Sequence, residues 1–293
     1  MRLAQRIEEA GRTAIIINAD SAQVYGDLQI LSARPAPAEM GGIEHRLYGT
    51  WDGAQACSAA DWAAAAKQEI AAIHAQGAVP ILCGGTGLYM QVLLEGIAPV
   101  PAIDAAIRSQ VRAMDIEILR ENLLSDDPQA ALRINERDLT RMQRALEVVR
   151  STGRTLSEWQ ECKVGGIAEQ VQLFPVVLLP EREDLYERCD RRFGWMIEHG
   201  AIGEVEALLA RDIDPDLPVM RAIGVPQIKQ YLKQEDIDLE KLQRLGAQAT
   251  RNYAKRQYTW FRNQPPKDWP RIHDVDTGLA AFRTLLTPIG AVA

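Results

Sequence analysis

The chain has 293 residues, 47% of them hydrophobic and 25% charged, enough for one large domain or for a core with an inserted domain. A formal net charge of −7 argues against indiscriminate nucleic-acid binding but allows a local basic patch. No apolar run approaches the roughly 20 residues that span a bilayer, and the N-terminus lacks the apolar segment of a secretory signal. The four cysteines are scattered without a CxxC pair, which argues against zinc or a disulfide framework and favours a reducing cytoplasm.

Residues 1–11 are predicted to form an amphipathic helix that ends at Gly11. The apolar, largely β-branched run 14–17 follows, the pattern of a strand buried on both faces of a parallel sheet. Asp20 comes just after this strand, where open α/β sheets bind ligands. Its position leaves two uses open: a chemical one, as a general base or metal ligand, and a capping one in a turn.

Ser58 and Asp61 have the spacing of a capping box and predict a helix over residues 62–76. A second buried strand is expected over residues 79–83, and the residues Gly-Gly-Thr-Gly follow it at 84–87. Glycines and free N–H groups at a strand end favour the binding of an anion or a polar base edge. A plain tight turn has the same sequence pattern, so both interpretations stand.

From about residue 103 the pattern is helical, with no clear strand before residues 171–179. This predicts an all-helical insertion into an α/β core. Arg137, Arg141 and Arg144 follow one another at i, i+4 and i+7, so they are expected on one helix face. Arginine favours phosphate or base recognition, while the acidic residues between them also suit an ordinary solvated face.

Residues 172–179 are predicted to return as a strand, followed by a helix with Arg188 and Arg192 at i, i+4. Such a pair could clamp a diphosphate or form ion pairs with neighbouring acids. Arg221 is expected near a helix start after the loop 216–224. The predicted long helix 242–261 carries a basic stripe with an aromatic residue, a plausible nucleic-acid face. The stripe consists of Arg251, Lys255, Tyr258 and Arg262.

Six motifs together resemble the tRNA dimethylallyltransferases, which prenylate adenosine beside the anticodon. Each motif alone is weak, but all six occur in the family's order and span nearly the whole chain. They are Asp20-Ser-Ala-Gln-Val-Tyr25, Gly84-Gly-Thr-Gly-Leu-Tyr89, Arg141-Met-Gln-Arg-Ala-Leu-Glu147, Arg192-Phe193, Leu217-Pro-Val-Met-Arg-Ala-Ile-Gly224 and Thr250-Arg-Asn-Tyr-Ala-Lys-Arg-Gln-Tyr-Thr-Trp260.

This resemblance implies an α/β fold: a P-loop-kinase-like parallel-sheet core over residues 1–102 and 171–293. The helical insertion, residues 103–170, would bind the tRNA anticodon stem-loop. The implied reaction moves a dimethylallyl group from dimethylallyl diphosphate to N6 of adenosine 37 in tRNA, with Mg²⁺ and release of diphosphate. ATP binding, a cytoplasmic location, no membrane association and a monomeric state are also expected, while the metal ligands stay unassigned.

By the same resemblance, Asp20 is the general base that accepts the N6 proton, which an otherwise poor amine nucleophile requires. Thr86 would contact the adenosine after it leaves its stack. Arg192 would stabilise the leaving diphosphate as negative charge develops, and Arg221 is the matching arginine of a second motif. The residues that match tRNA-contacting stretches are Asp20, Ser21, Ala22, Gln23, Thr86, Arg108, Thr140, Arg141, Met142, Gln143 and Arg144.

Three features depart from the family pattern. The family begins with a strand and a P-loop, G-x-T-x-S-G-K-[ST], which binds diphosphate through backbone N–H groups and its lysine; this sequence has no such motif. A late start, a trimmed chain or a degenerate copy would each explain this, and the intact motifs favour the first two. Gly224-Val-Pro-Gln227 replaces the family's G-[YV]-R-Q, while Arg34 and Glu44-His45 replace a lysine and a His-His pair.

Two other functions remain open beside tRNA prenylation. One is prenylation of free adenine nucleotides, although a mononucleotide would not need an arginine-bearing helical insertion. The other is an RNA-binding protein that has lost catalysis together with its P-loop.

Overall fold

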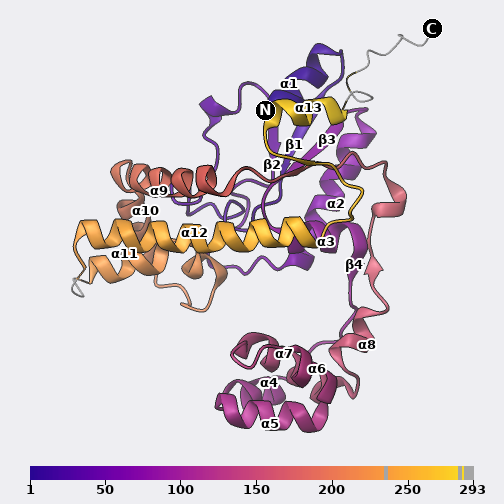
Figure 1. Cartoon of the computed structure of the whole chain (residues 1–293), viewed down its shortest axis with the longest axis vertical. Coiled ribbons are helices and arrows are strands. Elements are labelled where there is room, and N and C mark those ends of the chain that lie inside the picture. Colours follow the sequence, from indigo (N-terminus) through magenta and orange to yellow (C-terminus); the bar gives the residue numbers. More distant parts are fainter. Residues whose placement is uncertain (234–236, 283–285, 287–293) are drawn as a thin grey trace. The chain divides into compact units, whose positions relative to one another are not determined.

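The computed structural model describes residues 1–233, 237–282 and 286. The chain divides into two compact units, Met1–Leu93 with Val171–Ala293 and Leu94–Gln170. Each unit is described by itself below (Figure 1). Among the described residues, no helix is both long and apolar enough to cross a membrane.

The first unit is built on a parallel sheet, which confirms the predicted α/β class. Its strands lie in the order β2-β1-β3 and all run parallel. Every residue of the central strand β1 is buried, as its unbroken apolar run predicts. The bounds of the three strands are β1 Ala14–Asn18, β2 Glu44–Arg46 and β3 Val79–Cys83.

The predicted strand over residues 172–179 is wrong in length, because only β6 (Val177–Leu178) has strand pairing. It pairs in parallel with β7 (Arg271–Ile272), which is equally short. A strand requires a partner along its length, and β7 offers only two residues.

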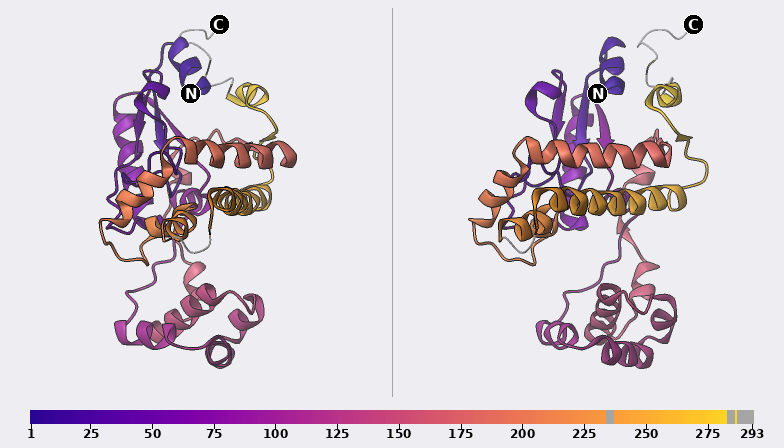
Figure 2. Two further views of the ribbon diagram at one scale, coloured as in Figure 1. Left: turned by 90° about the vertical axis from the view of Figure 1, so that its left-hand side faces the viewer. Right: turned by 60° about the vertical axis from the view of Figure 1, so that its left-hand side comes forward.

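Helices surround the sheet of the first unit. The predicted capping box is confirmed: the Asp61 N–H donates to Ser58 Oγ (3.1 Å), and the Ser58 N–H donates to Asp61 Oδ2 (3.0 Å). The helices α9 and α12 run side by side (Figure 2). Between them, the ring of Phe193 fills the space over Gly246. The helices are α1 Arg2–Glu9, α2 Ala59–Ala75, α3 Gly87–Glu95, α9 Arg182–Glu198, α10 Ala201–Leu209, α11 Val225–Leu232, α12 Leu239–Asn263 and α13 Val275–Leu279.

The second unit is mostly helical, with its own apolar core that includes Leu119, Leu123 and Leu146. The insertion predicted as all-helical over residues 103–170 also contains one short strand, β5 (Val164–Gly165), which pairs antiparallel with β4 (Gly96–Ile97). A Cβ at Gly96 would lie 2.3 Å from the Val164 carbonyl oxygen, so the pairing requires glycine there. Its remaining helices are α4 Ala105–Arg112, α5 Ile116–Asp126, α6 Pro128–Arg133, α7 Leu139–Thr152 and α8 Leu156–Gln160.

Candidate active site

The turn after β1 is held by its last residue, Asn18, whose side chain is fully buried. Asn18 Nδ2 donates to the carbonyl oxygens of Asp20 and Leu47, each at 3.0 Å, and its Oδ1 accepts from the Asp20 N–H at 2.9 Å. A buried amide is costly unless its polar atoms are bonded. Asn18 therefore fixes the backbone that carries Asp20.

Asp20 is half-buried, and its Oδ1 accepts from the Ala22 N–H at 2.8 Å. Burial raises the pKa of this carboxyl above its ordinary value. Hydrogen bonds from the backbone of Ala22 and Gln23 oppose the shift, as does the positive charge of Arg192. The carboxylate therefore caps the turn, and its raised pKa makes it a stronger base than an exposed aspartate.

Ser21, the residue after Asp20, links the Asp20 turn to Thr86. The Ser21 N–H donates to Thr86 Oγ1 (2.9 Å), and the Thr86 hydroxyl donates to Ser21 Oγ (3.2 Å). The Thr86 N–H also donates to the carbonyl oxygen of Ala19 (3.1 Å). These bonds join the turns that follow β1 and β3, so Asp20 and Thr86 share one edge of the sheet.

The glycines beside Thr86 are closely approached by the protein itself. A Cβ at any of them would lie between 2.2 and 2.3 Å from a neighbouring atom, closer than packing permits. Close approach of the protein itself is therefore one reason for glycine at these positions, and ligand binding by this loop stays a prediction. The neighbours are the Ala19 backbone at Gly84, Gln257 at Gly85 and Trp260 at Gly87.

Arg192 reaches the same cluster from α9. Its guanidinium donates to the carbonyl oxygen of Ser32 at 3.2 Å. Loss of hydration lowers the pKa of this guanidinium, and the negative charge of Asp20 opposes that shift. Asp20, Thr86 and Arg192 are therefore brought together, as the resemblance implies.

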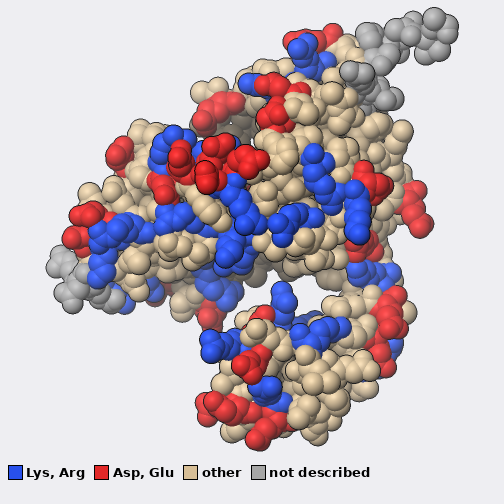
Figure 3. Space-filling model, in the orientation of Figure 1, with Lys and Arg blue, Asp and Glu red and all other residues tan. Residues whose placement is uncertain are grey.

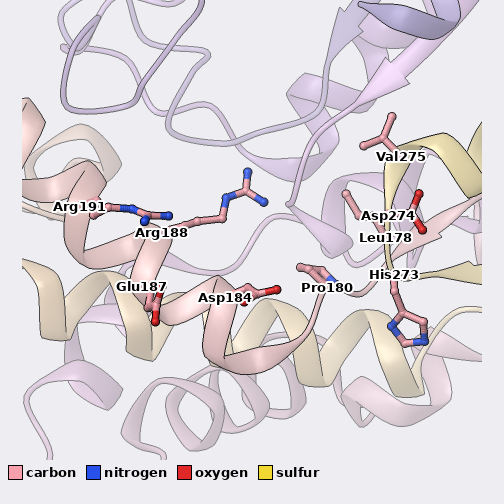
Figure 4. A pocket seen from close by; sticks show the side chains of 9 residues that line it. All are labelled: Leu178, Pro180, Asp184, Glu187, Arg188, Arg191, His273, Asp274 and Val275. Carbon is pink, nitrogen blue, oxygen red and sulfur yellow. The ribbon is translucent and has the colours of Figure 1, made fainter.

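A cavity of about 370 Å³ lies beyond the end of β6. Figure 4 shows Arg188 and Arg191 on its α9 side, with His273 and Asp274 on the opposite side. The charge of Arg188 also contributes to the lowered pKa of Arg192, so the two guanidiniums interact. The lining of the cavity is nevertheless mixed in charge, because Asp184, Glu187 and Asp274 line it together with Arg188 and Arg191.

Arg221 stands apart from the cluster. It ends the 3₁₀ turn Pro218–Arg221 and is exposed. The charge of Arg221 acts on Tyr25: burial raises the pKa of that phenol, and Arg221 opposes the shift. No described interaction joins Arg221 to Asp20.

Sequence reasoning did not single out Tyr253, which reaches the site from α12. Its hydroxyl hydrogen-bonds with the side chains of Thr86, Ser21 and Gln257; burial and the charge of Asp20 raise its pKa. Gln257 in turn donates to the carbonyl oxygen of Gly85 (2.9 Å). Both residues belong to the motif 250–260, but their charge and spacing gave no reason to select them.

In the second unit, the residues that match tRNA-contacting stretches differ in exposure. Thr140 and Arg141 are exposed and Gln143 is half-buried. Arg144 is half-buried, and loss of hydration lowers its pKa; the negative charge of Glu147 opposes this shift, and the like charge of Arg108 adds to it to a smaller extent. Within the described part of the chain, neither Arg108 nor Arg144 has an ion pair, although Glu147, which pairs with Arg112, also acts on Arg144 through its charge.

Two expectations for this unit need correction. Met142 is 2% exposed and packs in the apolar core, so its side chain does not reach RNA. Arg137 does not share a helix face with Arg141 and Arg144, because Asp138 caps α7 by accepting from the Arg141 N–H (3.2 Å). The helix thus begins after Arg137.

Part of the basic stripe on α12 is used within the first unit. Arg251 forms an ion pair with Asp190, and Arg182 stacks over the ring of Tyr258 at 5.0 Å. Lys255 and Arg262 stay exposed. Lys and Arg side chains nevertheless gather on the face over α9 and α12 (Figure 3).

The described residues do not by themselves fit a magnesium site. In residues 1–233, 237–282 and 286, no three His, Cys, Asp or Glu side chains converge as metal ligands. Around Asp20 the groups are hydroxyls and a guanidinium, whereas Mg²⁺ prefers carboxylates and substrate phosphates.

Comparison with known proteins identifies relatives over nearly the full sequence. The family model of IPP transferase matches residues 23–264. The tRNA dimethylallyltransferase of Erythrobacter litoralis is 60% identical over 94% of this chain and 87% of its own length. The tRNA dimethylallyltransferase of Novosphingobium aromaticivorans is 58% identical over 95% of this chain and 99% of its own length.

Solved structures show the same similarity. The tRNA isopentenylpyrophosphate transferase of Bacillus halodurans has a TM-score of 0.66 and 30% identity, covering 97% of this chain and 89% of its own. A eukaryotic dimethylallyltransferase acting on tRNA has a TM-score of 0.70 and 25% identity, covering 88% and 66%.

Proposed function

The chain belongs to the IPP transferase family, and from this membership we propose that it prenylates tRNA. It transfers a dimethylallyl group from dimethylallyl diphosphate to N6 of adenosine 37. The observation that carries the proposal beyond family membership is the cluster of Asp20, Thr86 and Arg192 at one sheet edge. A base, a polar contact and a cation are the groups that such a transfer needs.

Asp20 is the general base. The adenosine N6 attacks C1 of the dimethylallyl group, the C–O bond to diphosphate breaks, and one N6 proton passes to the Asp20 carboxylate. An exocyclic amine is a weak nucleophile, so a positioned base lowers the barrier. The raised pKa of Asp20 brings its basicity closer to the pH at which it works.

Thr86 holds the adenine beside this base. To reach a half-buried carboxylate, the base has to leave its stack in the anticodon loop. Thr86 is already fixed by Ser21 and Tyr253. A hydroxyl that is already fixed can orient the purine without losing further conformational entropy on binding.

Arg192 receives the leaving diphosphate, with Arg188 as a second cation four residues earlier on α9. Negative charge grows on the bridging oxygen as the C–O bond breaks, and a guanidinium stabilises it. The charge of Arg188 also acts on Arg192, although less than loss of hydration and the charge of Asp20 do. Magnesium, a prediction from the resemblance, would arrive with the diphosphate, and none of these steps depends on it.

The second unit grips the anticodon stem-loop through Arg108, Arg141 and Arg144. The charge of Arg108 acts on Arg144, although the negative charge of Glu147 acts on it more strongly; bound phosphate would supply a counter-charge for both arginines. Because tRNA is the acceptor, the enzyme works in the cytoplasm.

The test is transfer of radiolabelled dimethylallyl diphosphate to an anticodon stem-loop that carries adenosine 37. Label is expected in this RNA, in neither AMP nor a stem-loop with guanosine 37, and not with the variant Asp20→Asn. Preferential labelling of AMP would instead establish a free-nucleotide prenyltransferase. RNA binding without any transfer would indicate the binding protein without catalysis.

A further inference from the structure

A carboxylate outside the cluster organises the loop that follows the Asp20 motif. Glu204 on α10 accepts from three consecutive backbone N–H groups, those of Gln29 (2.5 Å), Ile30 (2.9 Å) and Leu31 (2.8 Å). Consecutive N–H groups that point the same way form an anion-binding concavity. Bonds to a charged acceptor are about twice as strong as neutral ones, so Glu204 supports the shape of this loop. It acts together with the loop's own bonds, from the Ala33 N–H to Ile30 O (2.9 Å) and from the Arg34 N–H to Gln29 O (3.0 Å).

The carbonyl oxygen of Ser32, the next residue of the loop, accepts hydrogen bonds from two residues of the proposed site. Ser32 O accepts from Gln23 Nε2 (3.1 Å) and from the Arg192 guanidinium (3.2 Å). A carbonyl oxygen has two lone pairs, and both are occupied here. One atom therefore holds a residue of the tRNA-contacting stretch and the cation assigned to the diphosphate.

The loop does not favour this shape without support. Ala33 has φ = 49°, in the left-handed region where a Cβ is unfavourable. Its carbonyl oxygen also accepts from Gln23 Nε2 (3.0 Å), so the strained residue is part of the same contact. The three bonds to Glu204 offset that strain from outside the loop.

We infer that Glu204 is a positioning residue that sets Gln23 and Arg192 together through the loop 29–33. The inference rests on the proposed function, since it assigns those two side chains to RNA and diphosphate. Loss of the Glu204 charge should then disturb both substrates at once. Changes at Gln23 or Arg192 alone should each affect mainly one of them.

The experiment compares Glu204→Gln with Glu206→Gln in the full chain. Glutamine keeps the size but loses the charge and presents an NH₂ group to one of the three N–H donors. Glu206 is exposed on the same helix, so its variant controls for the loss of one charge from α10. We expect kcat/KM for both dimethylallyl diphosphate and the stem-loop to fall by about 10- to 100-fold in Glu204→Gln, and neither to change in Glu206→Gln.

Two further measurements separate positioning from general destabilisation. The double variant Gln23→Ala/Glu204→Gln should bind the stem-loop about as weakly as Glu204→Gln alone, because both changes break one contact chain. Glu204→Asp keeps the charge but shortens the side chain by one CH₂ group, so kcat/KM for both substrates should still fall, by less than in Glu204→Gln. It carries the test if Glu204→Gln does not fold.

Wild-type kinetics in Glu204→Gln would overturn this inference and leave the proposed function standing. If Glu204→Gln does not fold, wild-type kinetics in Glu204→Asp would do the same. So would a loss that affects only one substrate. A wild-type chain that labels no RNA would overturn the proposed function and this inference with it.

Discussion

The turn around Asp20 and the exposed face of α7 are built in opposite ways. Asp20 is half-buried and bonded to the backbone, and Asn18, Ser21 and Thr86 hold its surroundings. The side chain of Arg141 is 79% exposed, and its ion pair is with Asp138, three residues away. Chemistry needs groups held in place before the substrate arrives, whereas phosphate binding needs cations that water and salt can still reach.

This contrast predicts a division of effects. Changes in the buried cluster should act on the rate of transfer and leave RNA affinity nearly unchanged. Changes on α7 should act on affinity and its salt dependence and leave the single-turnover rate of the bound complex nearly unchanged.

The largest effect is expected for Asp20→Asn, which keeps the bond from the Ala22 N–H but removes the base. The single-turnover rate should fall by about 10²- to 10⁴-fold, while stem-loop affinity by filter binding should stay within about twofold of wild type. Equal losses of rate and affinity would instead indicate that Asp20 has a structural role.

Arg192→Gln should come next, with a loss in kcat of about 10²- to 10³-fold, the cost of removing one donor to a developing negative charge. A second readout comes from pH. The base must be deprotonated, so the rate should fall as pH drops through the raised pKa of Asp20. Because Arg192 lowers that pKa, the acidic limb of the pH profile should move to higher pH in the variant; an unmoved limb would place Arg192 away from Asp20 during catalysis.

Tyr253→Phe should have a smaller effect, because it removes one hydroxyl and keeps the ring. One lost hydrogen bond to Thr86 costs roughly 1 kcal/mol, which corresponds to about a fivefold to tenfold fall in kcat. Tyr258→Phe is the matched control on the same helix, since its ring stacks with Arg182. Similar rates in the two variants would remove Tyr253 from the site.

The features that the sequence could predict depend on local contacts, whereas those that it could not predict depend on distant contacts. The strands β1 and β3 and the Ser58 cap follow from apolar runs and residue spacing, signals contained within a few neighbours. The extent of β6 depends on a partner some 90 residues later, at Arg271–Ile272. No local pattern carries that information.

The site shows the same limit. Position after a strand indicated Asp20, but only the motif resemblance joined it to Thr86 and Arg192. Tyr253 reaches the cluster from a distant helix, and Glu204 contacts the loop 29–31 from another, so periodicity could not select them. Arg137 was placed on a helix because spacing alone ignores the competing cap at Asp138.

The smallest effect is expected on α7 and tests the other side of the contrast. Arg144→Ala should weaken stem-loop binding and reduce the slope of log affinity against log salt by about 1, the loss of one phosphate contact. Arg120→Ala is the control, because it removes an exposed arginine from the same unit that pairs with Glu136 and matches no tRNA-contacting motif. If both variants keep the wild-type slope, Arg144 does not contact phosphate. If both flatten it equally, net charge rather than the built pair of Arg108 and Arg144 attracts the RNA.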